Sequence, residues 1–313
     1  MSNFWQNIPK PFTVLAPMDD VTDTVFRQII LETGRPDVFF TEFTNADGLV
    51  HGANGIPIRK LKFTPKEHPI VAQIWGTDPE HMEEAAVIAK KLGFDGIDIN
   101  MGCAVRDIIK RGAGSALIGN YELSKKIIDA VKRGAGDVPV SVKTRLGRGE
   151  NIAKEWTTFL LGENLAALTI HARLAKQMSK GEADWDEIAK IVEIRNKIAP
   201  ETLIIGNGDV KNYAEVFEKA EKYNVDGVMI GRGVFANPWV FNKNQTDHPK
   251  EDYINLLLAH MDLFEKTWGD AKNYAVLKKF FKMYIKDFKG ANQLRIKLME
   301  TNSFGEARKV LSI

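Results

Sequence analysis

Short runs of apolar residues alternate along most of the chain with longer segments in which apolar residues recur every three to four positions. The short runs have the length and composition of buried strands, and the longer segments have the spacing of helices that bury one side. The predicted strands are residues 12–18, 38–43, 70–76, 96–102, 138–145, 167–173, 202–206 and 227–233. The predicted helices between them are residues 23–33, 79–92, 123–133, 152–162, 185–198 and 213–223, with a further short helix at 237–241.

Eight strands that alternate with helices indicate a (β/α)8 TIM barrel. A doubly wound sheet is the competing α/β fold. The barrel is preferred because the count reaches eight and because polar residues follow each strand, on what would be one face of the molecule. We therefore predict an α/β TIM-barrel domain over residues 1–242.

The alternation ends after residue 242. Residues 243–250 form a polar linker, and the remainder carries amphipathic helical patterns without a strand signal. A small all-helical domain is predicted over residues 243–313.

The net charge neither indicates nor excludes a nucleic-acid partner, and the hydropathy gives no sign of a membrane-spanning segment. The chain of 313 residues carries 43 Lys and Arg against 41 Asp and Glu, and this balance does not by itself indicate a nucleic-acid partner. The helical tail is more basic than the rest. No apolar run approaches the roughly 20 residues that span a bilayer, and the amino terminus does not read as a signal peptide. We expect a cytoplasmic protein that does not associate with membranes.

The only cysteine, Cys103, follows a strand and a glycine. A lone cysteine excludes an intrachain disulfide and a CxxC metal knuckle, and no metal site is expected. Two explanations stay open. The residue is either a buried small hydrophobe or, among the nearby cations Arg106, Lys110 and Arg111, a nucleophile or a positioned proton donor.

Polar residues lie at the carboxyl ends of the predicted strands, which in a barrel converge at one mouth. Taken singly, Lys143 could be a surface lysine and His171 a hydrogen-bonded core histidine. Together with a phosphate held by the loops after the last two strands, they are compatible with a flavin ring, and Gln73 could serve its polar edge. Those loops are Asn207-Gly208-Asp209 and Gly231-Arg232-Gly233, whose glycines could also serve only as turns.

Several motifs in fixed order resemble the tRNA-dihydrouridine synthase family, most closely its bacterial synthase B-like branch. They include Ala16-Pro17-Met18, Asn100-Met101-Gly102-Cys103, residues 112–117, Val142-Lys143-x-Arg145, His171-x-Arg173, residues 181–185, 207–209 and 231–239. The resemblance covers nearly the whole chain. It implies an enzyme with flavin mononucleotide (FMN) that reduces the 5,6 double bond of a uridine in tRNA, with NADPH re-reducing the flavin. Hydride would reach C6 from the flavin, and Cys103 would protonate C5 of a flipped-out base.

The resemblance also implies residue roles. Asn100 and Arg173 would face the uracil or its backbone, and Lys278, Lys279 and Lys282, with Lys286, would contact tRNA phosphates from one side of a helix. A solvated basic face is the alternative for these lysines. No obligate protein partner is implied. The residues expected to bind FMN are Ala16, Pro17, Met18, Gln73, Lys143, His171, Asn207, Gly208, Asp209, Gly231 and Arg232.

The sequence departs from the family pattern around the cysteine. Ala104 and Arg106 stand where the family usually has proline and lysine, Asp107 replaces a commonly basic residue, and Ala175 stands where a second arginine often follows. These departures weaken the RNA-facing charge without removing the proton donor. Two other hypotheses therefore remain. One is an FMN barrel acting on a free pyrimidine or another small molecule, and the other is a catalytically impaired tRNA-binding relative.

Overall fold

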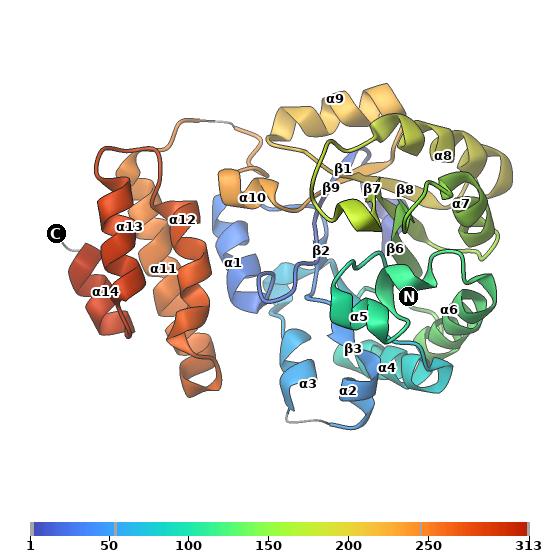
Figure 1. Ribbon diagram of the computed structural model, residues 1–313, viewed down its shortest axis with the longest axis horizontal. Helices are drawn as coiled ribbons and strands as arrows, with labels where there is room; N and C mark the ends of the chain where they lie inside the picture. Colours follow the sequence, from blue (N-terminus) through green and yellow to red (C-terminus); the bar gives the residue numbers. More distant parts are fainter. Residues whose placement is uncertain (1–2, 53–54, 245, 312–313) are drawn as a thin grey trace. The chain divides into compact units, whose positions relative to one another are not determined.

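The computed structural model describes residues 3–52, 55–244 and 246–311 (Figure 1). Contacts between residues divide the chain into two compact units. The barrel unit comprises Met1–Asp23, Pro36–Val210 and Ala214–Gly231, and the helical unit comprises Thr24–Arg35, Lys211–Tyr213 and Arg232–Ile313. The functional division predicted at residue 242 stays a prediction.

A parallel sheet in the order β1-β9-β8-β7-β6-β5-β4-β2 forms the barrel unit. A bridge between Val14 and Val38 connects β1 to the segment that enters β2, so the two ends of this order meet. This arrangement confirms the predicted TIM barrel. The strands are β1 (Phe12–Leu15), β2 (Phe39–Phe40), β4 (Ile70–Trp75), β5 (Gly96–Met101), β6 (Val140–Gly147), β7 (Ala167–Leu174), β8 (Leu203–Asn207) and β9 (Gly227–Ile230).

The second strand position is interrupted. Both β2 and the additional strand β3 (Thr44–Asn45) pair with β4, where a single strand over 38–43 was predicted. Between them, the Gln73 backbone N–H donates to the Thr41 hydroxyl at 3.1 Å instead of to a carbonyl of the neighbouring strand. The Thr41 side chain therefore replaces one backbone acceptor of the parallel sheet, and the regular strand pairing is interrupted at this residue.

Apolar side chains close the barrel at the amino-terminal ends of its strands. Trp5 in the short helix η1 (Phe4–Asn7) packs with Phe12, Val14, Phe40 and Met229, all fully buried. A Cβ on Gly227 would lie 2.4 Å from the Phe12 ring, so the close contact of β1 with β9 requires glycine. This plug leaves polar side chains to the opposite end of the barrel.

Amphipathic helices surround the sheet, as Figure 1 shows. The predicted bounds are confirmed for α4, α8 and α9. Helix α4 starts at an Asp78 cap and ends at the left-handed Gly93, which are ordinary start and stop signals. The long outer helices are α4 (Pro79–Leu92), α6 (Tyr121–Ala135), α7 (Ala153–Leu161), α8 (Trp185–Ile198) and α9 (Tyr213–Tyr223). Short helices are α2 (Ala46–Val50), α3 (Ile56–Lys60), η3 (Pro65–Glu67), α5 (Arg106–Lys110), η4 (Gly114–Leu117) and η5 (Ala175–Gln177).

The helical unit packs around a buried aromatic cluster. Phe26 stacks on Phe280, and His260 shares a 2.8 Å hydrogen bond with the buried Tyr284 hydroxyl. Among the described residues, no helix is both long and apolar enough to cross a lipid bilayer. The helices are α1 (Thr24–Thr33), α10 (Gly233–Ala236), α11 (Lys250–Trp268), η6 (Gly269–Ala271), η7 (Tyr274–Phe280), α12 (Phe281–Tyr284), α13 (Ala291–Glu300) and α14 (Phe304–Leu311).

The short helix predicted at residues 237–241 lies earlier in the chain, as α10. Asn237 has extended backbone angles and ends that helix, and its side chain accepts from the Trp239 N–H at 2.9 Å. An asparagine whose side chain bonds the backbone two residues later favours a turn over a helix. The prediction therefore placed the short helix about four residues too late in the chain.

Candidate active site

The carboxyl ends of the barrel strands bring together most of the predicted polar residues. Asn100 is in register with Lys143, and His171 with Asn207. Direct hydrogen bonds join Lys143 Nζ to Asn207 Oδ1 at 3.1 Å and Asn100 Nδ2 to Gln73 Oε1 at 3.0 Å. Strands β4 to β8 therefore present one continuous polar surface at the mouth of the barrel.

Lys143 is a cation in an unfavourable setting. Burial, with a smaller contribution from Arg145, lowers its pKa to about 7, although Asp98 and Cys103 act in the opposite direction. Its hydrogen-bond partner is the neutral side-chain amide of Asn207. Asn207 Nδ2 donates to the Met229 carbonyl at 2.8 Å, and this bond turns Oδ1 toward the lysine. A group that brings negative charge to this place would restore the full charge of Lys143.

Thr169 stands beside Lys143 in the register of β6 and β7. Its hydroxyl is fully buried and has no hydrogen-bond partner among the described residues. A buried hydroxyl without a partner costs stability unless a ligand or water satisfies it. Lys143 and Thr169 together fit the polar edge of a ring system with carbonyl and imide groups, such as a flavin.

Cys103 lies at the end of β5, and its backbone is held on both sides. Its N–H donates to Asn100 Oδ1 at 2.9 Å, and its carbonyl accepts from the Ser115 N–H at 2.9 Å. Burial raises the pKa of the thiol, against the lowering effects of a Val105 backbone hydrogen bond and of the nearby Arg145 and Lys143. The thiol is therefore protonated at neutral pH, as a proton donor must be.

Gly114 gives the glycine-rich motif after the cysteine a physical role. Its φ is +61°, and a Cβ there would lie 2.9 Å from the Cys103 carbonyl oxygen and 3.1 Å from Cys103 Cβ. Both the backbone conformation and the close contact require glycine. The turn at Gly114 thus packs directly against the cysteine.

Arg145 ties the cysteine loop to the loop after β7. Its Nε donates to the Gly102 carbonyl at 2.8 Å, and its Nη1 donates to the carbonyls of Met178 at 2.8 Å and Leu174 at 3.3 Å. A planar guanidinium suits such a bridge because its donors point in fixed directions. Arg145 connects two segments that border the mouth.

Arg173 is buried, with 2% of its surface exposed. Its Nη2 donates to Asp209 Oδ2 at 2.5 Å and to the Gly181 carbonyl at 2.6 Å, and its Nη1 lies 3.3 Å from His171 Nε2. The predicted FMN ligands His171 and Asp209 are therefore linked through a residue that was predicted to face the substrate. That substrate role stays a prediction.

The predicted FMN ligands Ala16, Pro17, Met18 and Gly231 lie around the junction of β1 and β9, whereas Gly208 follows β8. The Ala16 N–H donates to the Ile230 carbonyl at 2.9 Å, and a Cβ on Gly231 would come within 3.5 Å of Ala16 Cβ and 3.9 Å of Met18 Sδ. Pro17, between them, is half-buried, and Gly208 is buried with a φ of +137°. Arg232, the next residue after Gly231, belongs to the helical unit, where it precedes α10.

Comparison with known proteins decides the family. The sequence profile described as dihydrouridine synthase (Dus) matches residues 14–312. A probable tRNA-dihydrouridine synthase of Staphylococcus aureus strain Mu50 is 46% identical over 99% of this chain and 94% of its own length. A probable tRNA-dihydrouridine synthase 2 of Bacillus subtilis strain 168 is 45% identical over 99% of this chain and 95% of its own.

The chain belongs to the dihydrouridine synthase family. The resemblance inferred from its motifs is thereby confirmed. Among solved structures, the 6-hydroxypseudooxynicotine amine oxidase of Pseudomonas geniculata N1 matches with a TM-score of 0.54 at 14% identity, over 74% of this chain and 46% of that one. This likeness concerns the fold alone.

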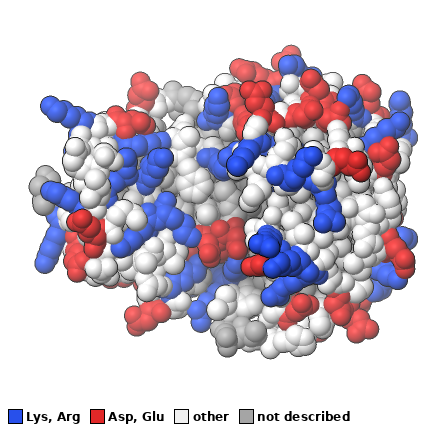
Figure 2. Space-filling model, viewed as in Figure 1, with Lys and Arg blue, Asp and Glu red and all other residues white. Residues whose placement is uncertain are grey.

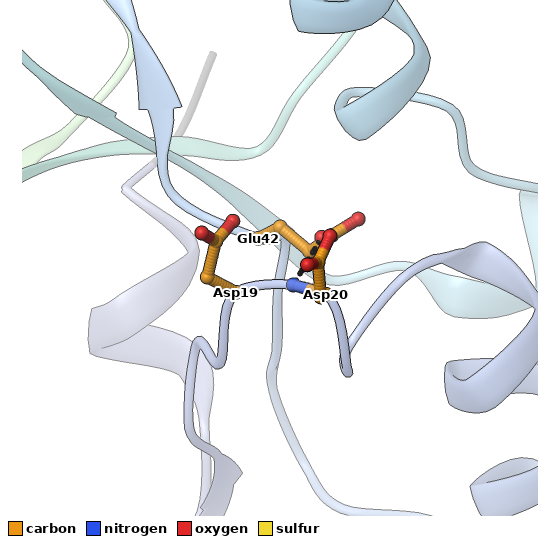
Figure 3. Close-up of side chains that lie close together, drawn as sticks. All are labelled: Asp19, Asp20 and Glu42. Carbon is orange, nitrogen blue, oxygen red and sulfur yellow. Dashed lines mark hydrogen bonds between the residues drawn. The ribbon is translucent and has the colours of Figure 1, made fainter. Parts of the chain in front are cut away.

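An acidic cluster also borders the mouth of this dihydrouridine synthase-family barrel. Carboxylate oxygens of Asp19, Asp20 and Glu42 lie within 4.8 Å of one another, and the Asp20 N–H donates to Glu42 Oε1 at 2.7 Å (Figure 3). Lys60 supplies a cation: its Nζ forms an ion pair with Asp19 and lies 4.0 Å from Glu42. The ammonium therefore balances part of the negative charge of these carboxylates.

The predicted tRNA-contacting lysines do not all lie in one helix. Helix η7 ends at Phe280, α12 ends at Tyr284, and Lys286 follows beyond both. Lys278 Nζ donates to the Met299 carbonyl at 2.8 Å, and Lys286 Nζ donates to the Ala236 carbonyl. Lys279 and Lys282 are exposed. Figure 2 shows both basic and acidic side chains on the visible face.

Reasoning from the sequence missed Asp98, Ser141 and Thr169. All three are polar, fully or almost fully buried, and lie inside strands. A usable signal was present, because Asp98 and Ser141 alternate with isoleucine or valine in strands that a barrel buries on both sides. A polar residue in that pattern points into the barrel and needs a partner there.

Proposed function

We propose that this protein is an FMN-dependent tRNA-dihydrouridine synthase that reduces the 5,6 double bond of a uridine in tRNA, with NADPH as the reductant. Membership of the family carries the proposal. Its chemical support is the protonated Cys103 thiol at the end of β5, near enough to Lys143 for each charge to affect the pKa of the other. The proposed location is the cytoplasm.

The barrel offers a consistent place for FMN. Lys143 and Thr169 would hold the polar edge of the ring, because Lys143 is a buried cation and the buried Thr169 hydroxyl has no hydrogen-bond partner among the described residues. When bound, FMN supplies the hydride that uridine receives at C6. The proposed FMN-binding residues are Ala16, Pro17, Met18, Gln73, Lys143, His171, Asn207, Gly208, Asp209, Gly231 and Arg232.

The protein's own residues supply the proton and hold its donor. Cys103 Sγ keeps its proton at neutral pH, because burial raises the pKa of the thiol, and delivers it to C5 of the uracil. Asn100 accepts from the backbone N–H of Cys103, and Arg145 donates to the Gly102 carbonyl, so both side chains hold the backbone of the loop. Closing of the mouth over the base excludes water and completes the arrangement.

The helical domain over residues 243–313 contributes tRNA binding in this proposal. It carries 12 Lys and Arg against 8 Asp and Glu in residues 250–313. Exposed lysines such as Lys279 and Lys282 attract the phosphate backbone without reading its sequence. Asn100 and Arg173 are the proposed contacts to the uracil or its adjacent backbone.

The deciding experiment supplies unmodified tRNA, NADPH and FMN to the purified protein and maps dihydrouridine along the tRNA. Wild-type protein is expected to modify defined uridines, and Cys103→Ser is expected to keep its FMN absorbance while losing most turnover, because an alcohol is a poorer acid than a thiol. Reduction of free uridine or uracil at the same rate as tRNA would favour the small-molecule alternative. FMN and tRNA binding without reduction would favour the impaired relative.

A further inference from the structure

A buried network of polar side chains connects β4, β5 and β6. It is made by Gln73, Asp98, Asn100 and Ser141. Asp98, toward the end of this network farthest from Cys103, is fully buried. Its Oδ1 accepts from Ser141 Oγ at 2.6 Å, and its Oδ2 accepts from Gln73 Nε2 at 2.7 Å. Burial raises the pKa of this carboxyl to about 6, so it is ionised at neutral pH despite its surroundings.

The network continues from Asp98 to the backbone of the cysteine. Gln73 Oε1 accepts from Asn100 Nδ2 at 3.0 Å. Asn100 Oδ1 then accepts from two backbone N–H groups, those of Gly102 at 3.1 Å and Cys103 at 2.9 Å. Three hydrogen bonds thus join a carboxylate in the barrel interior to the backbone N–H group of the proton donor.

The two ends of this chain determine its direction. An amide side chain donates from its nitrogen and accepts at its oxygen, a carboxylate only accepts, and a backbone N–H only donates. If Gln73 were turned over, its oxygen would face the Asp98 carboxylate and its nitrogen would face Asn100 Nδ2. Both hydrogen bonds would be lost, so the carboxylate and the backbone select one orientation of both amides.

We propose that Asp98 is a positioning residue that, through Gln73 and Asn100, fixes the backbone of Gly102 and Cys103 and so aims the thiol at the substrate. This inference rests on the proposed function, since it concerns delivery of a proton to uridine. The role requires an acceptor at position 98 that reaches Gln73, and it does not require the negative charge itself. It predicts an effect on the step that uses Cys103 that is much larger than any effect, through the proposed FMN ligand Gln73, on reduction of the flavin by NADPH.

Two variants of Asp98 separate orientation from charge. In Asp98→Asn, Oδ1 can accept from Gln73 while Nδ2 donates to Ser141, so the chain survives without the charge. Asp98→Leu keeps the number and branching of the side-chain heavy atoms but has no acceptor. Asp98→Ser, whose hydroxyl is too short to reach Gln73, replaces it where the larger leucine side chain prevents folding. Ser141→Ala is the matched control, because it removes a partner of Asp98 that lies outside the path to Cys103.

The two half-reactions are measured separately on each FMN-loaded protein, by flavin absorbance. Asp98→Leu is expected to slow oxidation of the pre-reduced enzyme by unmodified tRNA at least tenfold and to change reduction by NADPH less than twofold. Asp98→Asn and Ser141→Ala are expected to stay within threefold of wild type in both. An equal slowing of both half-reactions by Asp98→Leu, or an Asp98→Asn variant as slow as Asp98→Leu, would overturn the inference.

Two further readouts tie the effect to the cysteine. In a Cys103→Ala background, Asp98→Leu is expected to cause no additional slowing of tRNA reduction, because both changes act on the same step. In FMN-free protein, iodoacetamide is expected to alkylate Cys103 several-fold faster in Asp98→Leu than in wild type or Asp98→Asn. Additive losses, or equal alkylation in all three proteins, would count against the inference. A wild-type enzyme unable to oxidise its flavin with tRNA would instead overturn the proposed function, and the inference with it.

Discussion

The two sides of the barrel mouth satisfy their polar groups in opposite ways. On the side of β4 and β5, Gln73, Asp98 and Asn100 bond to one another and to the backbone of the cysteine loop. On the side of β6 and β7, Lys143 has a neutral partner and Thr169 has a hydroxyl that no described residue satisfies. The first side is complete within the protein, whereas the second leaves bonding capacity for something else.

This difference assigns a separate task to each side. Polar groups that satisfy one another make a rigid support, because any movement breaks several hydrogen bonds at once. Polar groups that lack partners are prepared for a ligand, at a cost to the ligand-free protein. We therefore assign positioning to the β4 and β5 side, where Gln73 is also a proposed FMN ligand, and binding of the cofactor's polar edge to the β6 and β7 side.

The largest expected effect comes from removing the proton donor between the two sides. Cys103→Ala should lower the rate of tRNA reduction about 10²- to 10⁴-fold, the usual contribution of general acid catalysis. FMN content and reduction by NADPH should stay near wild type, because the thiol is not needed for either. Single-turnover oxidation of the reduced enzyme by tRNA measures this. A variant with unchanged turnover would remove Cys103 from the mechanism.

The next largest effect concerns the free energy of unfolding and the buried carboxyl of Asp98 on the β4 and β5 side. The pKa of Asp98 is about 6 in the folded protein, above its ordinary value of 3.8, so its contribution to stability is full below pH 4 and is lost as the pH rises through 6. At pH 7.5 the ionised carboxylate costs roughly 3 kcal/mol at 1.36 kcal/mol per pKa unit.

Asp98→Asn removes that cost and should raise the free energy of unfolding at pH 7.5 by up to roughly 3 kcal/mol. At pH 4 the variant and wild type should differ little. Urea unfolding at both pH values measures the difference. A variant less stable than wild type at pH 7.5 would show that the charge itself stabilises the network.

A smaller effect should appear on the side that we assign to the cofactor. The pKa of Lys143 is about 7 in the cofactor-free protein, and a ligand with negative charge beside it raises that pKa. Binding then takes up a proton, so FMN affinity should be greatest below pH 7 and fall by up to about tenfold per pH unit above it.

Fluorescence titration of the FMN-free protein between pH 6 and 9 measures that slope. Lys143→Met should bind FMN more weakly below pH 7, by about ten- to a hundredfold, which is the usual range for a hydrogen bond to a charged group. It should also lose the dependence on pH. A slope that persists in Lys143→Met would assign the titration to another group.

The smallest expected effect lies in the helical unit. Replacing both Lys279 and Lys282 by glutamine should weaken tRNA binding several-fold at low salt and reduce the slope of log affinity against log salt by about one to two. Replacing both by arginine should preserve the affinity. Lys266→Gln, an exposed site on α11, controls for the loss of charge alone. Equal losses at all three lysines would indicate a diffuse field with no defined contact.

The strand pattern predicted the barrel because buried parallel strands are apolar along their whole length and the intervening helices are not. Where the structure differs, a single side chain had replaced a regular backbone interaction. Thr41 interrupts the second strand, and Asn237 ends α10 where a helix was expected to begin. Such local substitutions leave no periodic signal, and so periodicity could not reveal them.

The site was predictable as a set of strand ends and not as a set of contacts. The sequence placed Gln73, Asn100 and Lys143 at one mouth, but the bond from Gln73 to Asp98 depends on the register of two neighbouring strands. The burial of Arg173 against Asp209 likewise depends on a turn at Gly208 that brings the two together. Register and turn geometry arise from packing, which a single sequence does not display.

The backbone of Cys103 is held by Asn100, a residue of the barrel strand β5, and this has a practical consequence. Asn100 and the Gly114 turn hold the main chain at Cys103, so the side chains of residues 104–110 are not what locates the sulfur. Residues 105–107 are exposed and can vary, whereas Ile108 is buried beside Gly114. In the proposed function, changes at these exposed positions would alter what the segment offers to a nucleic acid while the reaction centre stays where it is. Grafting the segment between related barrels is thus a route to exchanging target preference.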